Sequence, residues 1–165
     1  MCKGLLAIGA LVMLMVLGSS SAGAADERVL GADGYRQLKL GMTRQQAEDT
    51  GLLRGAQHGA KCTFYYFVDA EGRMPSTSGV FISERTGVGA IGSTDLMNTP
   101  EHIGLGSKLD QLRRAYPKLK EDPRQDGVFV TPVPGNDRAV YEFVVTGDEV
   151  QDFVLQDADW ANACV

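Results

Sequence analysis

Short runs of β-branched and aromatic residues recur along this chain, separated by Gly, Pro and Asp, which is typical of antiparallel strands joined by tight turns. The clearest run covers residues 62–68, where strand-forming residues are nearly continuous. Further strands are predicted in segments of similar composition: 79–83, 88–91, 127–131, 139–146 and 150–155. The pairs 79–83 with 88–91 and 139–146 with 150–155 are each close enough in sequence to form a hairpin.

Two helix starts are also predicted, one before the first of these strands and one between the strands 88–91 and 127–131. Thr43 followed by Gln46 is a capping-box pattern, in which each side chain bonds the other residue's backbone, and it predicts a helix over 44–50. Ser107 is a typical N-cap residue and predicts a second helix that continues through Tyr116. Loops and turns are predicted in the remaining polar or Gly-rich segments: 25–32, 54–61 and 69–78.

The two helix starts share a longer pattern. Residues 38–47 and 103–112 both run apolar-x-apolar-Gly, then a helix start, then Gln. Such self-similarity is the signature of a repeated structural unit, and the alternative is chance likeness between two short patterns. We therefore predict an α+β fold in which two tandem helix-plus-antiparallel-β repeats, 25–98 and 99–165, form one continuous or paired sheet covered by helices on one face. The two repeats would make one compact domain.

The segment Gly41–Gln46 (Gly-Met-Thr-Arg-Gln-Gln), placed at a helix start, resembles the repeat signature of the β-lactamase inhibitory protein family. It is also similar to the small outer-membrane-assembly lipoprotein domain. The resemblance implies two helix-and-sheet repeats joined into a curved sheet, whose concave face grips a partner enzyme. The second half has Gly106–Leu109 (Gly-Ser-Lys-Leu) in place of this signature. The segment Thr99–Ser107, followed by Ala115–Pro117, also looks like a group of uncharacterised secreted bacterial proteins.

The N-terminus has the pattern of a secretory signal peptide. Lys3 supplies a positive charge, Leu5–Leu17 is an uncharged apolar run of 13 residues, and 22–24 (Ala-Gly-Ala) offers the small residues of a cleavage site. We predict that residues 1–24 are a signal peptide that is removed. An apolar run of 13 residues is too short for a transmembrane anchor, which needs about 20. We therefore expect a secreted, extracellular protein with no stable membrane insertion after cleavage.

The charge of the chain argues against one class of partner, and its cysteines predict a disulfide. The chain carries 16 basic and 21 acidic residues, a net charge of −5, and no basic stripe, which argues against a nucleic-acid partner. Cys62 and Cys164 remain after signal cleavage, and an even pair in an exported protein favours a disulfide over two free thiols. Trp160 would then pack the C-terminal tail beside that bond.

The sequence contains no motif that predicts a cofactor or a metal site. Neither a Gly-x-Ser-x-Gly nucleophile motif nor a phosphate-binding Gly-Lys-Ser/Thr loop occurs. His58 and His102 are the two histidines, and neither has another His or a Cys at the spacing of zinc ligands. An alternative function, that of a small extracellular enzyme, would use His58 or His102 as a general base.

The aromatic run within residues 62–68 is the best candidate for recognition of a partner. Side chains alternate between the two faces of a strand, so one aromatic pair would pack under the helices and the other would lie on the opposite face of the sheet. Exposed aromatic side chains are typical contact hot spots. The candidate binding face comprises Tyr65, Tyr66, Phe67 and Tyr141. We therefore predict a secreted, non-catalytic protein-binding module, of the kind that inhibits an extracellular enzyme or holds an envelope component.

Overall fold

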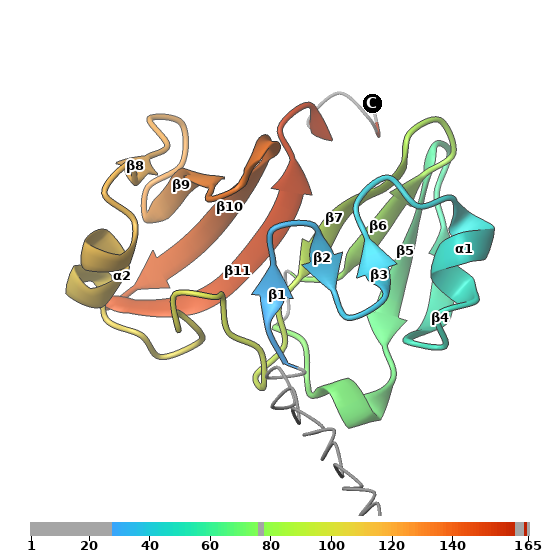
Figure 1. The fold of residues 1–165 in the computed structure, drawn as a ribbon, viewed down its shortest axis with the longest axis horizontal. Coiled ribbons are helices and arrows are strands. Elements are labelled where there is room, and N and C mark those ends of the chain that lie inside the picture. Colours follow the sequence, from blue (N-terminus) through green and yellow to red (C-terminus); the bar gives the residue numbers. More distant parts are fainter. Residues whose placement is uncertain (1–27, 76–77, 161–163, 165) are drawn as a thin grey trace, which may run out of the picture.

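A single sheet of antiparallel strands dominates the computed structural model, which describes residues 28–75, 78–160 and 164 (Figure 1). The described residues form eight strands in this sheet, in the order β4-β5-β6-β7-β11-β10-β9-β8. The strands are β4 (Leu53–His58), β5 (Cys62–Phe67), β6 (Val80–Ser83), β7 (Gly87–Gly92), β8 (Lys120–Glu121), β9 (Val128–Val133), β10 (Asn136–Thr146) and β11 (Glu149–Asp157). The strands β7 and β11 pair at the centre, so the earlier and later strands meet there.

A small three-stranded sheet lies against the middle of the large one, between the two helices (Figure 1). It consists of β1 (Leu30–Gly31), β2 (Gly34–Tyr35) and β3 (Leu38–Lys39). Leu30, Tyr35 and Leu38 are fully buried and join the core that lines one face of the large sheet. The Tyr141 hydroxyl of β10 donates a hydrogen bond to the Leu30 carbonyl at 2.7 Å, which ties the two sheets together.

The helices are short. They are α1 (Arg44–Glu48), the single 3-10 turn η1 (Asp69–Glu71), and α2 (Leu109–Ala115). The predicted capping box of α1 is confirmed, because the Thr43 hydroxyl accepts a bond from the Gln46 backbone N–H and the Gln46 side chain accepts one from the Thr43 backbone N–H. In the described part of the chain, no helix has the length and apolar character needed to cross a membrane.

The predicted fold class, tandem helix-plus-sheet repeats with helices covering one sheet face, is wrong. The described chain is mostly β-structure, and its helices α1 and α2 have only 5 and 7 residues. Helices of this length bury one or two side chains each, Ala47 in α1 and Leu112 in α2, and cannot cover eight strands. The small β1–β3 sheet supplies the missing cover, and its strands of two residues are too short to give a sequence pattern.

Most predicted strands are confirmed, and the loop predicted at residues 54–61 is wrong. That segment contains most of β4, whose residues are exposed from Arg54 to His58. An edge strand without a buried face shows no alternation of apolar and polar residues, so its sequence pattern is the same as that of a loop. A bulge at Gly55, with φ +66°, further interrupts the pattern between Arg54 and Gln57. The predicted signal peptide, residues 1–24, lies outside the described residues.

Candidate functional site

The register of the large sheet decides which side chains share a face. Directly opposite residues of antiparallel strands point to the same side. One such row crosses five strands, from β5 to β10, and begins at the aromatic run. Its members are Phe64, Phe81, Ala90, Gln156 and Val140. This row lies on the face opposite the core, which we call the open face.

An aromatic cluster occupies the open face over β5 and β6. The ring centroids of Phe64 and Tyr66 are 4.9 Å apart, those of Phe64 and Phe81 are 4.9 Å apart, and those of Phe81 and Trp160 are 5.8 Å apart. All four side chains are partly exposed. The guanidinium of Arg54 lies 5.9 Å from the centre of the Tyr66 ring. Partly exposed rings in mutual contact form a rigid surface that can bury apolar area against a partner at little entropic cost.

Two glycines make room for this cluster. A Cβ atom at Gly79 would lie 1.7 Å from Cε2 of Phe64, and one at Gly89 would lie 2.0 Å from Cε3 of Trp160. Any other residue at these positions would displace the ring above it. The sequence placed Phe64 in the aromatic run proposed for recognition, though not among the four candidate residues, and gave no indication of Phe81 or Trp160 as members of the site. The available signal was a glycine inside each predicted strand, which often marks the close approach of another group.

The structure separates the four aromatic residues that the sequence proposed as a binding face. Tyr65, Phe67 and Tyr141 are at most 3% exposed and point into the core, where Phe67 packs edge-on against Tyr35. Tyr66 alone among the four lies on the open face. On the covered face, Phe67 contacts Tyr35 of β2, Tyr141 bonds the Leu30 carbonyl of β1, and Tyr65 bonds Glu48 of α1. The candidate face is therefore built around Tyr66 and its neighbours on the open face.

Three of the four buried tyrosines in the described part of the chain donate hydrogen bonds to glutamates. Tyr65 donates to Glu48 of α1, and Tyr116 donates to Glu101 at 2.6 Å. Tyr35 donates to Glu71 at 2.5 Å, and Glu71 is itself buried and paired with a guanidinium. Burial, followed by the hydrogen bond to Glu48, raises the pKa of Tyr65 to about 12. These contacts stabilise the protonated hydroxyls and give the tyrosines a structural role.

This network predicts a loss of stability at alkaline pH. An unfolded tyrosine has a pKa of about 10, so the contribution of Tyr65 is fully present below pH 10 and is lost as pH rises toward its folded pKa of about 12. We expect Tyr65→Phe, which cannot ionise, to reduce the fall in the free energy of unfolding over this range. Urea unfolding at a series of pH values measures the effect. Tyr66→Phe on the open face is the matched control, and an equal change in both variants would contradict the prediction.

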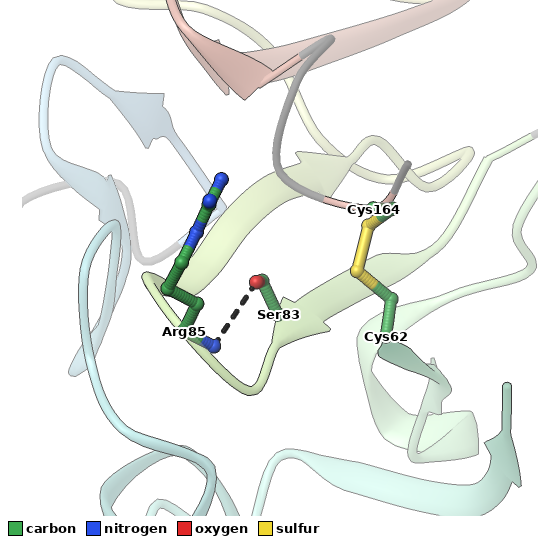
Figure 2. The surroundings of a disulfide bond; sticks show 4 residues. All are labelled: Cys62, Ser83, Arg85 and Cys164. Carbon is green, nitrogen blue, oxygen red and sulfur yellow. Dashed lines mark hydrogen bonds between the residues drawn. A yellow bond between two sulfur atoms is a disulfide. The ribbon is translucent and has the colours of Figure 1, made fainter. Parts of the chain in front are cut away.

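The structure joins Cys62 and Cys164 in a disulfide, with their Cα atoms 5.5 Å apart (Figure 2). Cys62 alternates with buried Thr63 on β5, so it lies on the same face as the aromatic cluster. Figure 2 places the bond beside Ser83 of β6, which is the register partner of Cys62. The Arg85 backbone N–H donates to the Ser83 hydroxyl at 3.2 Å, while the Arg85 side chain points away from the disulfide. The C-terminal end is thereby attached to the open face.

A hollow of about 560 Å³ continues the open face beyond Trp160, over β9, β10 and β11. Valine side chains contribute to its apolar part, the loop after β8 forms one wall, and Trp160 forms the other. The lining residues used below are Asp122, Arg124, Val130, Val140, Glu142 and Asp157. Trp160 and Asp157 also line a second hollow of about 480 Å³, near the β6–β7 turn. Trp160 thus lines both depressions, and its side chain is partly exposed.

The two histidines lie outside this face cluster and have ordinary surroundings. His58 is exposed on the edge strand β4, and its Nδ1 is 3.2 Å from the Thr63 hydroxyl. His102 is exposed in the loop before α2, in a left-handed conformation with φ 61°. The neighbouring Glu101 accepts a hydrogen bond from Tyr116. The enzyme alternative therefore stays a prediction.

Comparisons with known proteins bear on the fold. No protein-family model matches the sequence, and no curated protein matches it significantly. The crystal structure of the uncharacterised protein YfeY from Escherichia coli is similar to this chain, with a TM-score of 0.50 and 11% sequence identity. The similarity covers 78% of this chain and 99% of that chain. At this identity the likeness concerns the fold alone, and the resemblance to the β-lactamase inhibitory protein family stays a prediction.

Proposed function

We propose that this protein is a secreted, non-catalytic binding module that holds another protein against the open face of its large sheet. The observation that carries the proposal is the partly exposed aromatic cluster of Phe64, Tyr66, Phe81 and Trp160 on that face. Aromatic side chains at the centre of a surface are the usual anchors of protein–protein interfaces. The neighbouring hollow adds a recess that a protruding side chain of the partner would fill.

Support for an extracellular setting comes from two independent features. The N-terminal sequence has the charge, apolar run and small residues of a signal peptide. The Cys62–Cys164 disulfide is of the kind that persists in oxidising compartments. The partner would accordingly be an extracellular enzyme or an envelope protein, as the resemblance to an inhibitor family implies.

Affinity capture with a matched pair of variants tests this proposal. The mature, oxidised protein is immobilised, and secreted and envelope proteins of its own source are passed over it and identified by mass spectrometry. We expect one dominant partner, and we expect Tyr66→Ala to raise its dissociation constant by about 30-fold, because truncation of an aromatic hot spot costs about 2 kcal/mol. The dissociation constants are then measured by calorimetry.

Leu96→Ala is the control for that experiment. Leu96 is 39% exposed and lies in the loop after β7, outside the large sheet, so its truncation removes exposed apolar surface without touching the open face. Its affinity should stay within about twofold of the unaltered protein. Equal losses in the two variants, or repeated recovery of no partner, would count against a binding module that uses the open face.

A further inference from the structure

The hollow beside Trp160 carries an excess of negative charge. Its lining includes the carboxylates of Asp122, Glu142 and Asp157 and one guanidinium, that of Arg124. Arg124 pairs with Asp122. Its Nε and one terminal nitrogen donate hydrogen bonds to the two carboxylate oxygens of Asp122, at 3.1 and 2.8 Å. The Asp157 carboxylate is 3.8 Å from the guanidinium of Arg138, a residue that does not line this hollow. The charge that remains is centred on Glu142.

Glu142 sits in the sheet with one neutral partner. It is half-buried on β10, and the described residues place a single hydrogen-bond donor on it, the Gln156 side-chain amide at 3.1 Å. An amide donor leaves the negative charge of the carboxylate in place. The pKa of Arg124 is raised first by its bonds to Asp122 and more weakly by the charge of Glu142.

Apolar and aromatic surface surrounds this carboxylate. Val130 lies directly opposite Glu142 in the register of β9 and β10, and Val140 lies two residues along the same face. Trp160 forms the wall on the other side. An alkyl chain can lie along the two valines while a cation at its end reaches Glu142 and the face of an indole ring. A planar guanidinium fits this combination best, because it pairs with a carboxylate and also stacks on aromatic rings.

We infer that this hollow is a subsite for an arginine side chain of the bound protein, with Glu142 as its counter-charge and Val130, Val140 and Trp160 as its walls. The inference rests on the proposed function and names the chemistry that the partner must present. The charge of the whole chain, −5, supports it, because an acidic protein attracts basic segments during encounter.

The fluorescence of Trp160 reports directly on this subsite, because it is the only tryptophan in the sequence. The probe is an acetylated, amidated tetra-arginine peptide, titrated into the mature, oxidised protein at low salt. We expect a saturable change in Trp160 emission and an increase in the dissociation constant of about tenfold in Glu142→Gln. Glu84→Gln, which removes the same charge from an exposed turn, should bind like the unaltered protein.

Methyl chemical shifts and an uncharged peptide test the arginine subsite further. The methyl chemical shifts of Val130 and Val140 should move on titration, while those of Val133, buried in the core, should stay. Tetra-citrulline, which has a similar shape and no charge, should bind at least tenfold more weakly. Equal binding of both peptides, or equal losses in Glu142→Gln and Glu84→Gln, would overturn the arginine subsite. If either result accompanied a Tyr66-dependent protein partner, the subsite would fail while the proposed function stood.

Discussion

Replacement of both Cys62 and Cys164 by serine should lower the free energy of unfolding by about 4 kcal/mol. The disulfide joins residues separated by 102 positions, and closing a loop of that length removes conformational entropy from the unfolded chain, worth up to about 4.7 kcal/mol in the chain-entropy model. Urea unfolding of the oxidised protein and the double variant measures the difference. The melting temperature should fall by on the order of 10 °C.

The reduced, unaltered protein is the control for the disulfide. It lacks the same bond but keeps both native side chains, so its unfolding curve should coincide with that of the double variant. A double variant that unfolds at the same urea concentration as the oxidised protein would show that the bond contributes nothing to stability. A reduced protein as stable as the oxidised one would lead to the same conclusion by an independent route.

Phe143→Ala should destabilise the protein by about 3–5 kcal/mol, the usual cost of removing a large aromatic side chain from a packed core. Phe143 is fully buried on β10, and its ring is 5.7 Å from that of Phe153 and 5.5 Å from that of Tyr116. Its removal would leave a cavity between strands that a rigid sheet cannot close. Denaturant unfolding followed by circular dichroism measures the loss.

The neighbouring residue provides a comparison within the same strand. Val144 follows Phe143 on β10 but points to the open face, where it is only partly buried. Val144→Ala should therefore cost about 1 kcal/mol or less. If the two variants lost similar amounts of stability, the assignment of core and open face along β10 would be incorrect.

The separation of core from open face explains why the members of the candidate binding face were hard to predict. Period-two alternation in β5 shows that Phe64 and Tyr66 point one way and Tyr65 and Phe67 the other. All four side chains are aromatic, so composition does not say which pair is covered. The cover comes from β1–β3, whose Tyr35 packs against Phe67, and from α1, whose Glu48 accepts a bond from Tyr65; the two-residue strands of β1–β3 are too short to show a sequence pattern.

The contacts of Trp160 were also hard to predict from the sequence. The sequence places it near Cys164 and predicts that it packs the tail beside the disulfide; the structure places its ring against that of Phe81, with the ring centroids 5.8 Å apart. Its place on the wall of a hollow with Glu142 depends on the pairing of β10 with β11 and on the empty surface at Gly89. Contacts between residues so far apart in sequence leave no local signal.

The sequence by itself determined the features that depend on near neighbours or residue type: the capping box at Thr43 and Gln46, the strands of the two hairpins, and the choice of Cys62 and Cys164 as a disulfide pair. These follow from local hydrogen bonding, side-chain shape and residue counts. Only the tertiary structure decided the strand order, the face that β1–β3 cover, and the meeting of the aromatic cluster with the acidic hollow. The reason is physical: each of these depends on which distant segments bury one another's apolar surface, and several arrangements share the same local pattern.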